Sequence, residues 1–187
     1  MELKTIYFEK RGRENTEEVL RLTKQRADEL GIKTVVIAST RGDTAVRAID
    51  VLQGLRVIAV TLVSGFRTPD TQQFTQENRQ IVEGRGGVVL TTTHAFGGIS
   101  RAMRNTFNAY VTGDIIANTL RIFGEGMKVV VEIAMMAADG GLVRTNEEII
   151  AIGGTGKGAD TAVVLQPVNS HDFFDLKVKE ILCKPHF

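Results

Sequence analysis

The chain has 187 residues, of which 43% are hydrophobic and 24% charged, as is ordinary for one globular domain. Its 23 Lys and Arg residues nearly balance 22 Asp and Glu residues, so the net charge of +1 gives no reason to expect nucleic acid or an anionic membrane as a partner. The single cysteine, Cys183, excludes an internal disulfide, and we expect it to be a buried residue of a late strand. Residues 1–4 are too polar for a signal peptide, and no apolar run approaches the roughly 20 residues of a membrane span, so we expect a cytoplasmic protein.

Strand and helix patterns alternate along the first half of the chain. We expect strands over residues 3–8, 34–38, 55–62 and 87–91. We expect helices over residues 16–30, 43–52 and 68–83. Asn15 or Thr16 can cap the first of these helices and Gly31 suits its left-handed end, while Thr68 and Pro69 suit the start of the third.

The second half predicts more helix and then a group of strands. Residues 97–123 are expected to be helical in pieces, broken near residues 112–113. Residues 126–138 form a helix that is apolar nearly all round, so it is either sandwiched inside the domain or packed on another subunit, and we expect a homo-oligomer. The last strands are expected over 148–152, 161–165 and 176–182. Residues 153–161 leave no room for a crossover helix, so at least one late strand is antiparallel. The alternation predicts one domain, 1–187, with a mostly parallel sheet covered on both faces.

In open α/β sheets, ligands bind beyond the carboxyl ends of the strands. The first loop at such an end is Ser39-Thr40-Arg41-Gly42-Asp43-Thr44, which leaves a buried strand and opens a helix. Free amides at a helix start, a glycine and hydroxyl groups suit a phosphate, and Arg41 can add a charge-assisted hydrogen bond. The alternative is an ordinary helix start capped by Asp43.

The second loop, 91–98, contains Thr92, Thr93 and His94 and precedes a helix. These side chains predict a polar wall beside a ligand. His94 is the one candidate for general acid or base catalysis, and the alternative is a histidine that only forms hydrogen bonds in a pocket or loop. No spacing of His or Cys residues indicates a metal site.

The third loop, 153–160, is rich in glycine and carries Gly154, Thr155, Gly156 and Lys157. Its exposed amides and its lysine suit an anion, although the loop contains neither a P-loop nor a Rossmann motif. The alternatives are a tight connection between two strands and a solvated lysine. Asp160 can accept a hydrogen bond from a ligand or from its own turn.

Residues 39–44 resemble the phosphate loop of flavodoxins, written T/S-x-T-G-x-T, which holds the phosphate of flavin mononucleotide (FMN). Ser39, Gly42 and Thr44 match that motif, whereas Arg41 replaces its middle threonine. The match covers six residues, and the chain order around it differs from that of flavodoxin.

Four stretches resemble the C-terminal α/β domain of pyruvate kinase and, more closely, stand-alone proteins described as pyruvate kinase α/β-domain-like. These stretches are residues 15–20, 29–45, 124–141 and 150–162. The resemblance implies a three-layer α/β/α fold with a mostly parallel sheet, core strand order 3-2-1-4-5 and an antiparallel last core strand. It places the reversal of strand order between the strands that end at Ala38 and Ile152, so that loops 39–44 and 153–160 face one crevice.

The resemblance also implies a ligand. In pyruvate kinase the loop equivalent to 39–44 cradles a phosphate of a sugar-bisphosphate effector, and in the stand-alone proteins we expect FMN. Pyruvate kinase activity is not expected, because its chemistry belongs to a separate TIM-barrel domain for which this chain has no room.

We therefore expect a protein that binds a phosphorylated small molecule, FMN, and that acts as a flavin-dependent oxidoreductase if it is an enzyme. Two alternatives are a non-catalytic regulatory module for a sugar phosphate or nucleotide and a purely structural, oligomer-forming protein. The expected cofactor-binding residues are Ser39, Thr40, Arg41, Gly42, Asp43, Thr44, Thr92, Thr93, His94, Gly154, Thr155, Gly156 and Lys157.

Overall fold

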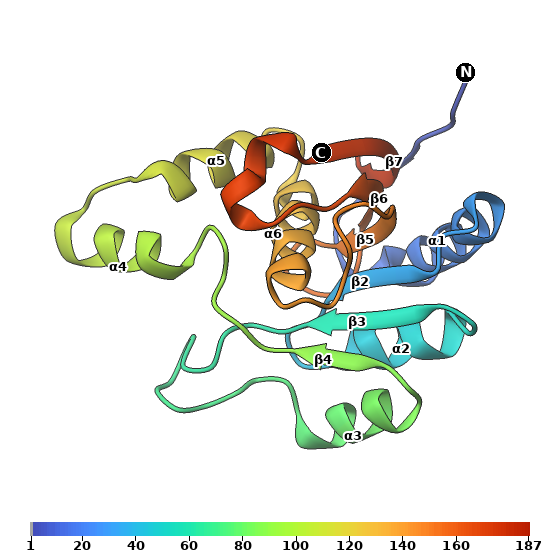
Figure 1. Cartoon of the computed structure of the whole chain (residues 1–187), viewed down its shortest axis with the longest axis horizontal. Coiled ribbons are helices and arrows are strands. Elements are labelled where there is room, and N and C mark those ends of the chain that lie inside the picture. Colours follow the sequence, from blue (N-terminus) through green and yellow to red (C-terminus); the bar gives the residue numbers. More distant parts are fainter. Residues whose placement is uncertain (1) are drawn as a thin grey trace.

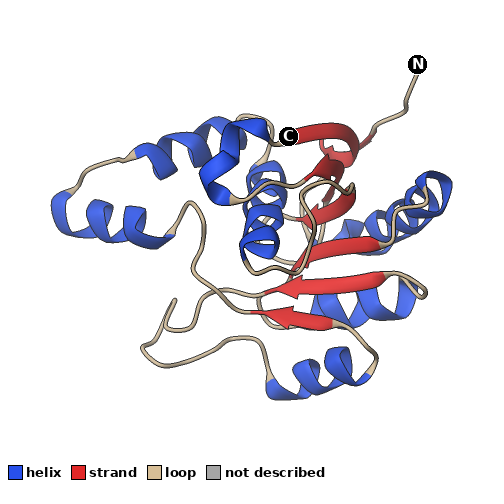
Figure 2. Ribbon diagram, viewed as in Figure 1, coloured by secondary structure: helices blue, strands red, loops and turns tan. Residues whose placement is uncertain are grey.

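The computed structural model describes residues 2–187, which contain seven strands in one mixed sheet (Figures 1 and 2). The strands are β1 (Ile6–Phe8), β2 (Thr34–Ala38), β3 (Arg56–Val60), β4 (Val88–Leu90), β5 (Ile149–Gly153), β6 (Thr161–Gln166) and β7 (Lys177–Pro185). They are ordered β1-β7-β6-β5-β2-β3-β4. Strands β2 to β5 are parallel to their neighbours in this group, and β6 is antiparallel to both β5 and β7. Counted from β2, the core order is 3-2-1-4-5 with an antiparallel last strand, which confirms the prediction.

Helices cover both faces of this sheet and make the fold a three-layer α/β/α arrangement. One face carries α1 (Thr16–Leu30), α2 (Asp43–Val51) and α3 (Gln76–Gly84). The other face carries α6 (Glu125–Asp139), with α5 (Thr112–Arg121) packed on α6. Helix α4 (Gly98–Phe107) and α5 form an arm that projects from the body (Figure 1). Two short 3-10 turns, η1 (Arg13–Asn15) and η2 (Ser170–Asp175), complete the described helices.

Alternation along the strands divides the core into two halves. In β2, Val35 and Ile37 join the hydrophobic cluster beneath α1 and α2, whereas Val36 joins the cluster beneath α6. All three residues are fully buried. A strand with helices on both faces needs apolar residues at every position, and the uninterrupted β-branched run of this strand meets that requirement.

Helix α6 is sandwiched within its own chain. Eleven of its 15 residues are buried, and it lies between the sheet and the elements α5 and η2. Its all-round apolar surface is therefore explained by internal packing and no longer argues for a second subunit.

The predicted helix over 68–83 is wrong in its first half, because α3 begins only at Gln76. The residues at the predicted start instead form a turn, in which the Thr71 amide and hydroxyl both donate to the Thr68 carbonyl and Asp70 has a φ of 58°. Pro69 suits the second position of such a turn as well as it suits a helix start. The true cap is Thr75, whose hydroxyl accepts a hydrogen bond from the Asn78 amide at 3.2 Å.

The break in the 97–123 segment lies a few residues earlier than predicted, at 108–111, where Asn108 ends α4 in a left-handed conformation. Gly113 is inside α5, and it allows close packing rather than a break, since a Cβ there would lie 2.9 Å from the Phe96 carbonyl oxygen. Cys183 is fully buried in β7, as predicted.

Candidate functional site

Four loops meet at one edge of the sheet. Because β2, β3, β4 and β5 are parallel, their carboxyl ends lie together (Figure 1). The loops that follow them are 39–42, 61–75, 91–97 and 154–160. The strand order reverses between β2 and β5, so the first and last of these loops leave adjacent strands at the switch point, where α/β proteins bind ligands.

Loop 39–44 presents backbone amides that the protein does not use. Within residues 2–187, the amides of residues 40–44 donate no hydrogen bond. The next amide, that of Ala45, donates to the Ser39 hydroxyl oxygen at 3.3 Å. The Asp43 side chain makes no capping hydrogen bond, so the alternative of a self-capped helix start is not realised. The free amides and the positive end of the α2 dipole suit an anion.

The side chains of this loop add hydroxyl donors. Ser39 and Thr44 are buried, Thr40 is half-buried, and Arg41 and Asp43 are exposed. The Ser39 hydroxyl oxygen accepts from Ala45 and retains its own proton for donation. The exposed Asp43 carboxylate is the one negative charge of the loop, and Arg41, two residues earlier, carries its one positive charge.

The loop is held in place by the segment that precedes α3. The Arg41 carbonyl accepts from the Thr75 amide at 3.2 Å and from the Asn78 side-chain amide at 3.0 Å. Gly42 has a φ of 103°, and a Cβ at this position would overlap Asn78 and lie 2.9 Å from the Phe74 ring. Glycine is therefore required here both by the backbone conformation and by the space available.

Loop 153–160 satisfies much of its own hydrogen bonding. The buried carboxylate of Asp160 accepts from the amides of Gly12 at 2.9 Å and Thr155 at 3.0 Å, and from the Thr161 hydroxyl at 2.8 Å. The Lys157 amide donates within the loop, to Thr155, at 3.0 Å. Asp160 thus bonds its own turn, which is one of the two predicted alternatives.

The amides of Gly154 and Gly156 have no partner within residues 2–187, and the Lys157 side chain is exposed and forms no ion pair there. This loop therefore offers fewer free donors than loop 39–44. The assignment of Gly154, Thr155, Gly156 and Lys157 to a ligand site stays a prediction.

His94 connects the loops after β3 and β4. Its Nε2 accepts a hydrogen bond from the Val63 amide at 3.2 Å, and its ring lies 5.4 Å from the Phe66 ring. Burial lowers the pKa of His94 below 6.5, and Lys128 and Arg101 lower it further, against the opposing effect of Glu132. The ring is therefore neutral at pH 7, with its proton on Nδ1. Its position in a pocket wall fits the hydrogen-bonding alternative, and a catalytic role stays a prediction.

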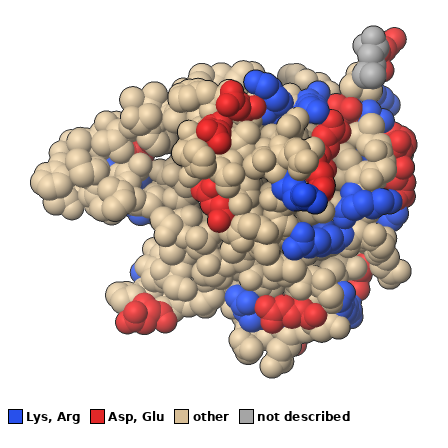
Figure 3. Space-filling view, in the orientation of Figure 1, with Lys and Arg blue, Asp and Glu red and all other residues tan. Residues whose placement is uncertain are grey.

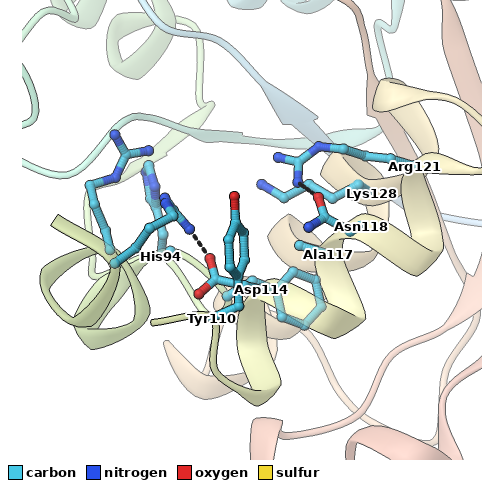
Figure 4. A pocket seen from close by; sticks show the side chains of 11 residues that line it. His94, Tyr110, Asp114, Ala117, Asn118, Arg121 and Lys128 are labelled. Atoms are coloured by element: carbon cyan, nitrogen blue, oxygen red, sulfur yellow. Dashed lines mark hydrogen bonds and ion pairs between the residues drawn. The ribbon is translucent and has the colours of Figure 1, made fainter. Parts of the chain in front are cut away.

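His94 borders two hollows. One, of about 370 Å³, is also lined by Thr92 and Thr93, so the structure brings the three predicted residues of this loop together. The other, of about 200 Å³, lies between α4, α5 and the first turns of α6 (Figure 4). Neither hollow is lined by residues of loop 39–44 or 153–160.

The smaller hollow contains residues that the sequence did not single out. Its cations are Arg101, Arg104, Arg121 and Lys128. In the sequence, these four residues look like solvent-exposed positions of helices. The spacing of three between Arg101 and Arg104, on one side of a helix, was the only signal available.

Within residues 2–187, no three His, Cys, Asp or Glu side chains are grouped in a way that could hold a metal ion. In the same part of the chain, no helix combines the length and the apolar character needed to cross a membrane.

Comparison with known proteins identifies the family. A pyruvate kinase from Cryptosporidium parvum is 13% identical, with a TM-score of 0.43, and the match covers 82% of this chain and 22% of that one. Cryptosporidium parvum pyruvate kinase in complex with ADP is 14% identical, with a TM-score of 0.39 and coverage of 91% and 24%. The chain thus spans less than a quarter of the length of these enzymes. The family model described as "Pyruvate kinase, alpha/beta domain" matches residues 17–165, and the chain belongs to that family.

Proposed function

We propose that this chain binds a phosphorylated small molecule, FMN, with the phosphate on loop 39–44. The observation that carries the proposal is the run of amides at residues 40–44, which have no partner within residues 2–187 and open α2. A phosphate dianion accepts several hydrogen bonds at once, and a helix start of this kind is among the commonest ways in which proteins supply them.

The residues of the loop fit a phosphate in three respects. The amides are free, the hydroxyls of Ser39, Thr40 and Thr44 add donors, and Gly42 allows the left-handed turn that begins α2. Arg41 is exposed and free to form a charge-assisted hydrogen bond. The flavin ring would extend along the carboxyl edge toward His94 or loop 153–160. Bound FMN would supply hydride or single-electron transfer, so an oxidoreductase is the reaction class that we propose.

The same cradle also suits a sugar phosphate or a nucleotide, since it recognises the phosphate rather than the group attached to it. Native mass spectrometry of the purified protein would separate these ligands by mass. We expect a bound mass equal to that of FMN and protein that absorbs at flavin wavelengths. A sugar phosphate or nucleotide mass, with no rise in melting temperature on addition of FMN, would favour the regulatory alternative.

The location of the phosphate can be tested by Thr44→Val, which removes a buried hydroxyl and keeps the side-chain shape. We expect FMN affinity, measured by quenching of flavin fluorescence, to fall by about 1–3 kcal/mol because a phosphate oxygen loses its donor. Thr106→Val is the matched control, since Thr106 is exposed on α4, away from the loop. If Thr44→Val folds normally and binds FMN as the unmodified chain does, the phosphate does not rest on this loop.

We also propose that the chain self-associates through the arm formed by α4 and α5. Helix α4 has no buried residue although its Ile99, Met103 and Phe107 form an apolar stripe, and a short helix of this kind is marginal without a packing partner. The arm is almost free of charged atoms on the face seen in Figure 3. Its large apolar side chains, with exposed fractions from 54% to 80%, are Ile99, Phe107, Tyr110, Ile115, Ile122 and Phe123.

Six such side chains present roughly 800 Å² of surface, about one partner's share of a standard interface. A second copy is the occupant that we propose, because the same patch on two copies is self-complementary in a twofold dimer. Sedimentation velocity should give a dimer for the unmodified chain and a monomer for Phe107→Ser. A monomer at 100 μM of the unmodified chain would rule out this interface.

A further inference from the structure

The smaller hollow beside His94 concentrates permanent positive charge. Arg101 and Arg104 come from α4, Arg121 from the end of α5, and Lys128 from the first turns of α6. Figure 4 shows Arg121 and Lys128 on one side of the hollow, with Tyr110 between them and the opposite wall, which carries His94 and Asp114. Cations from three separate helices meet here because α5 packs on α6 and α4 contacts α5.

Three carboxylates balance most of this charge, and one of them, that of Asp114, lines the hollow itself. Arg104 pairs with Asp114, Arg121 with Glu125, and Lys128 with Glu132. Arg101 has no carboxylate within ion-pair distance in residues 2–187, and its guanidinium lies 4.3 Å from the centre of the Phe66 ring. The hollow therefore keeps one uncompensated cation in addition to the three paired ones.

Two of the three paired acids also accept hydrogen bonds from the backbone. The Glu132 carboxylate accepts from the Phe96 amide at 2.9 Å, and the Asp114 carboxylate accepts from the Val111 amide at 3.3 Å. These acids consequently act as fixed supports behind the cations. The ammonium group of Lys128 has three donors and the guanidinium of Arg104 has five, and each uses one of them on its acid. The remaining donors are available to a ligand.

We propose that this hollow binds a small polyanion, with one anionic group near Arg101 and Arg104 and another near Arg121 and Lys128. The volume of about 200 Å³ suits a molecule of the size of a tricarboxylic acid or a small phosphorylated acid. Asn118 on α5 lines the same wall; its Oδ1 accepts from the Arg121 guanidinium at 2.9 Å, and its NH₂ group can donate to a hydroxyl of such a ligand. An anion here neutralises the charge of Arg101, which has no ion pair of its own within residues 2–187. The site is separate from loop 39–44, since the two share no residue.

The experiment is calorimetric titration of the FMN-free full chain at constant ionic strength, with citrate in one arm and inorganic phosphate in the other. We expect saturable one-to-one binding of citrate. Phosphate can also occupy loop 39–44 in the FMN-free chain, so its binding to the hollow is the part that Arg101→Gln removes. Tighter citrate would indicate that the natural groups are carboxylates, and tighter phosphate in the hollow would indicate phosphates. Arg101→Gln and Arg121→Gln should each weaken the tighter anion by about tenfold through loss of a charge-assisted hydrogen bond. Both side chains are exposed, so the variants should fold, which circular dichroism checks.

Arg144→Gln is the matched control, because the Arg144 side chain is 76% exposed and its one ion pair within residues 2–187 is with Glu147. A second readout is the proton resonance of the His94 ring. Its titration should move to higher pH when the anion neutralises Arg101 and Lys128, which lower the pKa of His94 in the free protein. The proposal would be overturned if citrate showed no saturable binding and phosphate binding were unaffected by Arg101→Gln, or if Arg101→Gln and Arg144→Gln weakened anion binding equally. Thr44→Val should leave citrate binding unchanged. The proposed phosphate site on loop 39–44 and the proposed polyanion site in the hollow can therefore be refuted independently.

Discussion

Replacement of Asp160 by alanine tests how the glycine-rich loop is held together. The side chain is fully buried and accepts three hydrogen bonds. Their donors are the amides of Gly12 and Thr155 and the hydroxyl of Thr161, so the carboxylate joins the N-terminal segment, loop 153–160 and the start of β6. Neither amide donates to any other group within residues 2–187.

The expected loss follows from the groups left behind. Asp160→Ala leaves two amides unpaired, at about 1–3 kcal/mol each, so the free energy of unfolding should fall by about 4 kcal/mol. For a domain of this size that corresponds to a melting temperature lower by about 8–16 °C. Asp160→Asn keeps an oxygen for the two amides and an NH₂ group that can donate to Thr161. It should cost only about 1–2 kcal/mol, because charge-assisted hydrogen bonds are stronger than neutral ones.

Urea unfolding followed by circular dichroism measures all three proteins under one set of conditions. Asp28→Ala is the control, since the Asp28 side chain is 58% exposed and forms a surface ion pair with Lys24, worth at most about 1 kcal/mol. The reasoning would be refuted if Asp160→Ala lost less than about 1 kcal/mol, or if asparagine were as harmful as alanine.

Three other outcomes are expected. Gly42→Ala should lower the free energy of unfolding by about 2–4 kcal/mol in urea melts, because it adds backbone strain and an overlap with Asn78. Gly31→Ala adds the same kind of strain with no atom within 4 Å of the new Cβ, so it should cost about 1 kcal/mol. Equal losses in the two variants would contradict this reasoning. Because the pKa of His94 is lower in the folded chain, the unfolded chain takes up the proton at a higher pH as the solution is acidified. The contribution of His94 to the free energy of unfolding is therefore complete above pH 6.5 and declines below it. His94→Gln should reduce that decline by at most about 1.4 kcal/mol per pH unit in melts from pH 8 to pH 5, and identical pH profiles would argue against a lowered pKa. Burial raises the pKa of Cys183 to about 12, so a thiol reagent at pH 8 should label it only in urea, and rapid labelling of the folded chain would show an accessible thiol.

The strands and most helices could be predicted because their signals are local. The β-branched run at 34–38 corresponds residue for residue to β2, and α2 begins at Asp43, directly after Gly42, as expected. The false start at Thr68 shows the limit of such signals. Pro69 is compatible with a helix and with a turn, and the hydrogen bonds that decide between them depend on contacts of the folded loop, such as that of the Gly65 amide with the Thr71 carbonyl at 2.9 Å.

One part of the candidate site could likewise be predicted from local sequence, and another part could not. Loop 39–44 could be predicted because a buried strand, a glycine and a helix start follow one another in the chain. The cationic hollow could not, because Arg101 and Lys128 are 27 positions apart and meet only through the docking of three helices. The buried Glu132 was also missed, since a single acid in an apolar helix gives no hint that it accepts from the Phe96 amide.

The loop after β3 links the parts of the carboxyl edge. Residues 61–75 form neither helix nor strand, and a connection of that length is uncommon in a compact domain unless it serves a site. Its Thr75 amide binds the Arg41 carbonyl, its Val63 amide binds His94, and Gln72 secures the loop internally through the Leu62 carbonyl at 2.9 Å. One segment therefore sets the positions of the phosphate loop and of the histidine beside the cationic hollow.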